Sequence, residues 1–181
     1  MVLDPRSVGD HTPLSIHREE LKQVTSYMGI HLDNLFSWSD HVDFVCSRLQ
    51  QRLYFLRRLR VFGVSQNVMF LFYQAVMESV IRYGMTAWFG NLSAQSKSKL
   101  QRLVQTAMKV MGRTEKLSLE SIYDQSVLRQ AQRVLSDPSH ILHMEYELLP
   151  SGRRYRIPKC KLNRFKHSFV PTSIKILNNF K

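Results

Sequence analysis

Residues 39–60, SDHVDFVCSRLQQRLYFLRRLR, decide the fold that we expect for this chain. Apolar side chains recur there every three or four residues, which is the period of an α-helix that buries one face. They form one stripe of Val42, Val45, Cys46, Leu49, Leu53, Leu56 and Leu59. Ser37 or Ser39 is placed to cap the first turn, and Gly63 is placed to end the helix. The stretch therefore predicts a long amphipathic helix with a buried stripe.

The residues before this helix follow a different period. Residues 14–17 alternate apolar and polar side chains, and 26–32 is a second short candidate for strand structure. Residues 1–13 contain Pro5, Gly9 and Pro13, which break regular structure, so we expect a loose leader there. The sequence thus predicts a leader at 1–13 and a small antiparallel β element at 14–37.

The residues after the first helix return repeatedly to helical periodicity. Further helices are expected at about 65–82, 93–111 and 118–135, with a shorter one at 139–146. A helical domain would span 38–149, and a basic tail with helical stretches at 161–169 and 172–180 would span 150–181. The expected fold class is mainly α, with four to five helices, the N-terminal β element and the basic C-terminal tail.

The charge balance points to an anionic partner. The chain has 26 basic and 14 acidic residues, a net charge of +12, and no acidic residue follows Glu147. Such an excess favours polyanions, with nucleic acid first and acidic membrane surfaces second. The alternative is a basic surface that is merely solvated. No uncharged apolar stretch is long enough to suggest a membrane span, so we expect no membrane association.

Two groups of basic residues are the candidate nucleic-acid contacts. Guanidinium groups bind phosphates through paired hydrogen bonds, and neighbouring aromatic rings can stack on bases. In the first helix, Tyr54 and Phe55 lie between such arginines, and in the tail Tyr155 does. The predicted contact residues are Arg48, Arg52, Arg57, Arg58, Arg60, Arg153, Arg154, Arg156, Lys159, Lys161 and Arg164.

Several of these motifs together resemble a known family. Tyr27, Gly29, Leu32, Asp33, Leu35 and Trp38 lead into Leu56-Arg57-Arg58-Leu59-Arg60, and the tail contains Pro150-Ser151-Gly152-Arg153-Arg154-Tyr155-Arg156. In this order they resemble the region after the catalytic palm in reverse transcriptases of LINE-type (non-LTR) retrotransposons, from about residue 13 to 178. The resemblance implies a thumb and C-terminal extension that contact a template–primer. It also implies that the missing palm is a possible packing partner.

No catalytic centre can be assembled from the sequence. A reverse transcriptase needs a pair of palm aspartates for its magnesium ions, and no two aspartates are adjacent here. His31-Leu32-Asp33 matches the first part of an iron- and oxoglutarate-dependent oxygenase triad, but a helical chain cannot form the barrel that such a site needs. His140, His143, Cys160 and His167 match no ordinary zinc spacing. We therefore expect no enzyme activity, no metal and no cofactor.

Three functions remain as hypotheses. The main one is a non-catalytic, retrotransposon-derived fragment that binds RNA or DNA without sequence preference. Segments resembling residues 14–60 also bear the label of an AlkB-homologue N-terminal domain, which would imply a tRNA-modifying dioxygenase or methyltransferase. A host-recruited protein-interaction module is the third. Two distant cysteines, Cys46 and Cys160, form no disulfide framework, so we expect an intracellular protein of the nucleus or cytoplasm.

Overall fold

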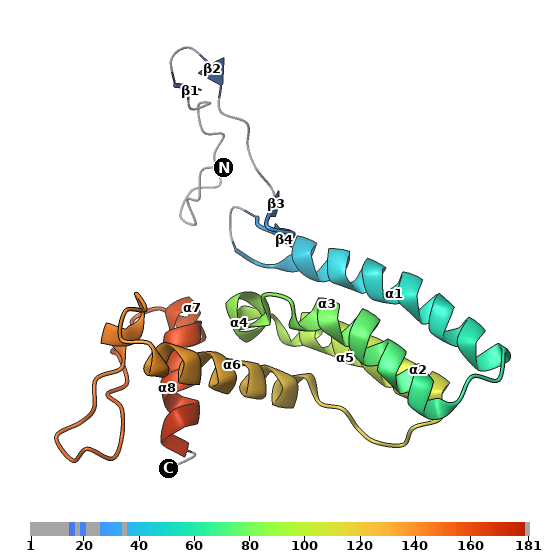
Figure 1. The fold of residues 1–181 in the computed structure, drawn as a ribbon. Helices are drawn as coiled ribbons and strands as arrows, with labels where there is room; N and C mark the ends of the chain where they lie inside the picture. Colours follow the sequence, from blue (N-terminus) through green and yellow to red (C-terminus); the bar gives the residue numbers. More distant parts are fainter. Residues whose placement is uncertain (1–14, 17–18, 21–25, 34–35, 180–181) are drawn as a thin grey trace.

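The computed structural model describes residues 15–16, 19–20, 26–33 and 36–179. The predicted leader at 1–13 lies outside these residues. Within them the fold is mainly α, with a small antiparallel β element at the N-terminal side, as predicted. Figure 1 shows the helices gathered into one body, with the β segments of residues 26–31 at one end of helix α1 (Ser39–Val61) and those of residues 15–16 and 19–20 farther from the helices.

Two short antiparallel ladders make up the β element. Strand β1 (Ser15–Ile16) pairs with β2 (Glu19–Glu20), and β3 (Ser26–Tyr27) pairs with β4 (Ile30–His31). Met28 and Gly29 join β3 to β4, and both have positive φ angles of 50° and 76°. Positive φ at both central residues is the geometry of a tight type I′ hairpin turn, which glycine adopts at little cost. We call residues 26–31 the hairpin.

Helix α1 (Ser39–Val61) buries the predicted stripe, including Val42, Leu49 and Leu56. Trp38 occupies the N-cap position and makes no side-chain cap hydrogen bond, but the predicted role of Ser37 is confirmed, because its Oγ accepts a hydrogen bond of 3.3 Å from the Ser39 amide of the first turn.

The carboxylate of Asp33 accepts backbone amides at the start of α1. Its Oδ1 accepts a hydrogen bond from the Ser37 amide at 2.9 Å, and its Oδ2 accepts one from the Trp38 amide at 3.0 Å. The Ser37 hydroxyl donates to the same carboxylate at 3.0 Å, so Asp33 and Ser37 together order the entry to α1, and the ionised carboxylate is the stronger acceptor of the two.

The second predicted helix forms, but it is widened in the middle. Helices α2 (Gln66–Phe72) and α3 (Ser79–Arg82) are joined without a break by the π-helical segment η1 (Tyr73–Glu78). A π segment holds extra residues per turn and often occurs near functional sites. It precedes Val80 and Tyr83, which line the pocket described below.

The remaining helices complete the chain. They are α4 (Met85–Trp88), η2 (Phe89–Asn91), α5 (Ala94–Met111), α6 (Leu119–Ser136), η3 (His143–Glu145), α7 (Asn163–Lys166) and α8 (Phe169–Asn179). Serines cap the predicted helices at 93–111 and 118–135, since Ser93 accepts from the Ser96 amide and Ser118 from the Ser121 amide. Gly112, with a φ of 74°, ends α5.

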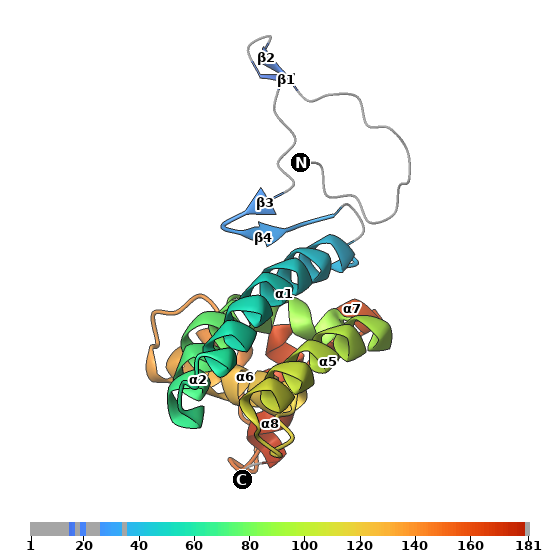
Figure 2. The ribbon, with the colours of Figure 1, turned by 90° about the vertical axis from the view of Figure 1, so that its right-hand side faces the viewer.

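The core lies where α1, the α2–α3 segment and α5 meet. Helix α1 packs against α5 and against α2, η1 and α3, as Figures 1 and 2 both show. Trp88 and Phe89 are fully buried in this core. Helix α8 packs against α6 around Ile174, on the opposite side of the body from α1. Part of the predicted basic tail is therefore packed structure.

Gly84 brings the hairpin close to the core. A Cβ atom at this position would lie 2.7 Å from Cδ1 of Ile30, and its φ is 59°. Both facts favour glycine, because a side chain would collide with β4 in a strained backbone conformation. The hairpin can thus lie against the end of α3 and form one wall of the candidate site.

Candidate nucleic-acid interface

The arginines of α1 form a positively charged surface. Arg48, Arg57, Arg58 and Arg60 are exposed, and Arg52 is half-buried. Within the part of the chain that the structure describes, none of these five arginines forms an ion pair with a carboxylate. Asp43 is the nearby acid on the same helix, and it pairs with Lys99 of α5 at 2.5 Å. The positive charge of α1 is therefore left without a local acidic partner.

The arginines differ in what they already contact. Arg58 lies over the Phe62 ring, with its guanidinium carbon 5.1 Å from the ring centroid. The Nη1 group of Arg60 donates to the Val110 carbonyl at 2.7 Å, near the C-terminal end of α5. A cation there stabilises the free carbonyls of a helix end. Arg60 thus has a structural role beside any contact with nucleic acid.

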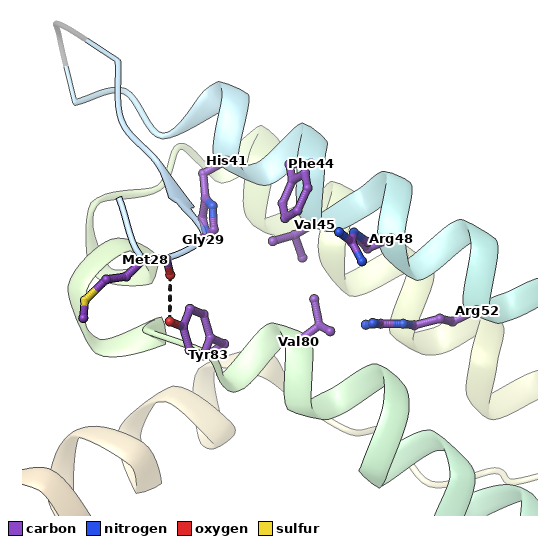
Figure 3. Close-up of a pocket in the computed structure, with 9 residues that line it drawn as sticks. All are labelled: Met28, Gly29, His41, Phe44, Val45, Arg48, Arg52, Val80 and Tyr83. Carbon is purple, nitrogen blue, oxygen red and sulfur yellow. Dashed lines mark hydrogen bonds between the residues drawn. The ribbon is translucent and has the colours of Figure 1, made fainter. Parts of the chain in front are cut away.

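Arg48 and Arg52 lie on one wall of a pocket that we call the hairpin pocket. It has a volume of about 280 Å³ and lies between the hairpin, α1 and the end of α3. Its lining residues are Met28, Gly29, His41, Phe44, Val45, Arg48, Arg52, Val80 and Tyr83. Figure 3 shows the α1 side chains pointing toward Val80 and Tyr83 across the pocket. The Tyr83 hydroxyl donates to the Met28 carbonyl at 2.7 Å and closes one end.

The two pocket arginines are in unequal surroundings. The Arg48 guanidinium carbon lies 5.0 Å from the centroid of Phe44, within the range of a cation–π contact. The Nη1 atom of Arg52 is shielded from solvent and has no hydrogen-bond partner among the described residues. Burial, with a smaller contribution from Arg48, lowers the pKa of Arg52. Both effects disfavour the bare cation and would be relieved by an anion.

His41 is a buried, neutral donor at the back of the pocket. It is 2% exposed, and its Nδ1 accepts a hydrogen bond of 3.4 Å from the His31 amide. The ring proton is therefore on Nε2, which has no partner among the described residues. The edge of the ring packs on Trp88, with centroids 5.0 Å apart. Burial, and secondarily His31, lowers the pKa of His41 to about 4.

This lowered pKa predicts acid lability. A free histidine has a pKa near 6.5, so between about pH 6.5 and pH 4 the unfolded chain binds a proton that folded His41 does not. The contribution to the free energy of unfolding is complete above about pH 6.5 and falls, by on the order of 3 kcal/mol, as the pH drops to about 4. Urea unfolding at several pH values would measure it.

The control is the same titration on two variants. His41→Phe keeps an aromatic ring and should flatten the pH dependence in this window, whereas replacing the exposed His167 by glutamine should leave it unchanged. An equally steep loss of stability in His41→Phe would show that other groups cause it.

The predicted contacts after residue 150 lie elsewhere. Arg153 and Arg154 are exposed at a turn of a loop whose sides meet at a bridge between Leu148 and Tyr155. Arg156 forms an ion pair with Glu147, at 3.7 Å. Arg154 and Arg156 border a second cavity of about 590 Å³ beside Lys175 of α8. This loop and α1 lie on different sides of the body (Figure 1), so the predicted contacts form two separate groups.

Of the last three predicted contacts, only one lies near the arginine-bearing helix α1. Lys159, Lys161 and Arg164 are exposed, and Arg164 belongs to α7. The Arg164 guanidinium carbon lies 5.7 Å from the Phe36 ring centroid, near the start of α1. Arg164 therefore extends the basic surface toward the N-terminal end of α1.

Other site residues were not predicted from the sequence. Met28, Val80 and Tyr83 have no chemical motif, and only the fold brings them to the pocket. His41 could have been noticed, because a histidine beside Val42 interrupts an otherwise apolar stripe. A third cavity, of about 580 Å³, gathers Arg82, Arg129, Arg133 and His140 at α6, and its basic residues were also missed.

His31 and Asp33, which match the first part of an oxygenase triad in the sequence, make structural contacts instead. The ring of His31 packs on Phe44, with centroids 4.4 Å apart, and Asp33 accepts the amides of Ser37 and Trp38. In the described ranges, no cluster of three or more histidine, cysteine, aspartate or glutamate side chains is arranged to hold a metal ion. None of the helices in those ranges combines the length and apolarity needed to cross a bilayer.

Comparison with known proteins gives one family match. Residues 38–79, less than a quarter of the chain, match the family described as "Alkylated DNA repair protein alkB homolog 8, N-terminal". This segment covers α1, α2, η1 and the first residue of α3. No curated protein and no solved structure matches the chain.

The match corrects one prediction. The resemblance to a LINE-type reverse transcriptase is wrong, because the matching family is the alkB homologue and no comparison indicates a reverse transcriptase region. The short motifs that suggested it, such as Leu-Arg-Arg-Leu-Arg at 56–60, are the basic end of an amphipathic helix, which unrelated proteins can share. Residues 38–79 are similar to the alkB homolog 8 N-terminal segment.

Proposed function

We propose that this chain is a non-catalytic nucleic-acid-binding module akin to the N-terminal part of alkB homolog 8. The observation that supports it best is the row of arginines on α1 without ion pairs in the described part of the chain. Arg48 and Arg52 stand beside Phe44, an arrangement that suits phosphate and base contacts together. All these arginines fall within the matched segment.

The family name supports the same class of partner. A protein described as repairing alkylated DNA acts on nucleic acid, and the net charge of +12 favours a polyanion independently. The structural roles of His31 and Asp33, the residues of the incomplete oxygenase triad, support a binding role without chemistry. An intracellular location follows from such a partner.

The test is a titration with labelled single-stranded RNA, single-stranded DNA and duplex DNA. Phosphate contacts release counterions, so the affinity should fall steeply between about 50 and 200 mM salt. Similar affinities for unrelated sequences would support non-specific binding. If none of the three nucleic acids binds at the lower salt concentration, the proposed function is wrong.

The basic loop at 150–156 provides a further prediction. Replacing Arg153, Arg154 and Arg156 together by alanine should weaken binding to all sequences alike and reduce the salt slope by up to about three units. Arg156 is already paired with Glu147, so its share should be the smallest. Single variants measured over a salt series would show this order. An unchanged slope in the triple variant would show that the loop is only solvated.

A protein-interaction module is the second candidate, and one observation favours it. Large apolar side chains are exposed around the far end of α1 and on α2, with Phe55 at 55%, Phe62 at 69% and Leu71 at 64% exposure. Exposed apolar groups of this size often mark contact surfaces. If nucleic acid fails to bind while the chain self-associates, and Phe62→Ser abolishes the association, this candidate replaces the first.

A further inference from the structure

We propose that the hairpin pocket binds one unstacked nucleotide, with its base against the apolar walls and its phosphate on Arg48 and Arg52. This inference rests on the proposed function and names a subsite within it. The same chemistry is present in a free mononucleotide and in a nucleotide that is splayed out of a single strand.

The phosphate end of the pocket is defined by the two guanidinium groups. Figure 3 shows Arg48 and Arg52 reaching toward the space between α1 and Val80. The shielded Nη1 of Arg52 lacks a partner in the described residues, and a buried polar group without a partner is costly. Phosphate oxygens can satisfy this donor, and two neighbouring guanidinium groups can bind one phosphate from two sides.

The apolar lining of the pocket suits a base. Its surface is formed mainly by Phe44, Val45, Val80 and the ring of Tyr83. Aromatic rings of this kind stack on any base because every base has a flat π face. The volume of about 280 Å³ is at the small end for ligand pockets and leaves room for one nucleotide rather than two.

His41 adds a polar donor among the apolar walls of the pocket. It lines the pocket, is 2% exposed, and presents a neutral Nε2–H without a partner among the described residues. A neutral donor in an apolar wall suits a carbonyl oxygen or a ring nitrogen of a base. Inorganic phosphate bound to Arg48 and Arg52 would leave the apolar walls of the pocket unused. The combination therefore favours a nucleotide over a simple anion.

The test uses the full chain with adenosine 5′-monophosphate, adenosine and inorganic phosphate as separate probes. Binding can be followed by calorimetry and by intrinsic tryptophan fluorescence, to which Trp38 contributes together with Trp88, whose ring contacts His41. The monophosphate should bind at least about tenfold more tightly than either part alone, since stacking and phosphate contacts act together. Equal affinity for inorganic phosphate and the monophosphate would contradict a base subsite.

Two variants test whether the monophosphate binds in the hairpin pocket. Val80→Phe fills the pocket without changing any charge, and Arg52→Gln removes the shielded guanidinium group. Each should weaken monophosphate binding about tenfold or more. The matched control is Val68→Phe, the same change at a valine on α2 that is 53% exposed, and it should have no effect. Circular dichroism checks that the variants fold. If folded Val80→Phe and Arg52→Gln both bind like the wild type, the inference is wrong.

A strand experiment distinguishes the two sources of the nucleotide. A thymidine oligonucleotide should bind the wild type several-fold more tightly than an abasic strand of equal length, and Val80→Phe should remove this difference. If monophosphate binds but the two strands do not differ, the pocket is a site for free nucleotides. Salt-dependent strand binding without any monophosphate binding would overturn the pocket but keep the proposed function. Failure of every strand would overturn the proposed function itself.

Discussion

Replacing Arg48 and Arg52 together by glutamine is expected to weaken binding to single-stranded nucleic acid by about 10- to 100-fold at low salt. Each charge-assisted hydrogen bond to phosphate contributes roughly 1.5–3 kcal/mol, and part of this is kept by water and neighbouring arginines. The slope of log affinity against log salt should also fall, by about one unit for each phosphate that the variant no longer neutralises. Fluorescence anisotropy over a salt series gives both quantities.

The matched control removes two charges elsewhere. Arg102 and Lys109 are exposed on α5, and glutamine at both positions changes the net charge by the same amount. This variant should bind almost as well as the wild type, because direct binding of phosphate rather than net charge determines the affinity. Equal decreases in affinity in the two double variants would mean that the site is not on α1.

Replacing Trp88 by alanine should cost about 3–5 kcal/mol of the free energy of unfolding. Trp88 is fully buried, contacts His41 and Phe89 edge-on, and donates its indole N–H to the Tyr83 carbonyl at 3.0 Å. Its removal leaves a large cavity behind the hairpin pocket. Chemical denaturation followed by circular dichroism measures the decrease.

The comparison for Trp88 is an aromatic residue outside the core. Tyr54 is 58% exposed on α1, and its replacement by alanine should change the free energy of unfolding by no more than about 0.5 kcal/mol. A decrease below about 1 kcal/mol in Trp88→Ala would contradict the packing described around His41 and Trp88.

The elements that depend on neighbours in sequence could be predicted. The stripe of α1 and the serine caps of α5 and α6 follow from spacing within a few residues. The part of the Asp33 carboxylate at the start of α1 could not, because no helical spacing places it against the amides of Ser37 and Trp38. The π segment at 73–78 could not be predicted either, because an almost wholly apolar helix shows no hydrophobic periodicity that an extra residue could disturb.

Only the arginine side of the candidate site could be predicted from the sequence. Arg48 and Arg52 follow from charge and helical spacing, but the wall opposite them comes from residues far along the chain. The hydrogen bond between Tyr83 and Met28 joins positions 55 residues apart, and the approach of the hairpin depends on Gly84. Contacts between residues so far apart along the chain leave no local sequence pattern from which they could be predicted. The family resemblance failed for a similar reason, because short basic helical motifs carry little information about ancestry.

The central claim is that the arginines of α1 bind nucleic acid, and arginine side-chain NMR tests it most directly. On addition of a short single-stranded oligonucleotide, the Nε–Hε resonances of Arg48 and Arg52 should shift, and those of Arg129 and Arg133 on α6 should stay in place. The shifts should reverse as salt is added. Resonances of Arg48 and Arg52 that remain unchanged while the oligonucleotide binds, or shifts confined to the α6 arginines, would contradict the claim.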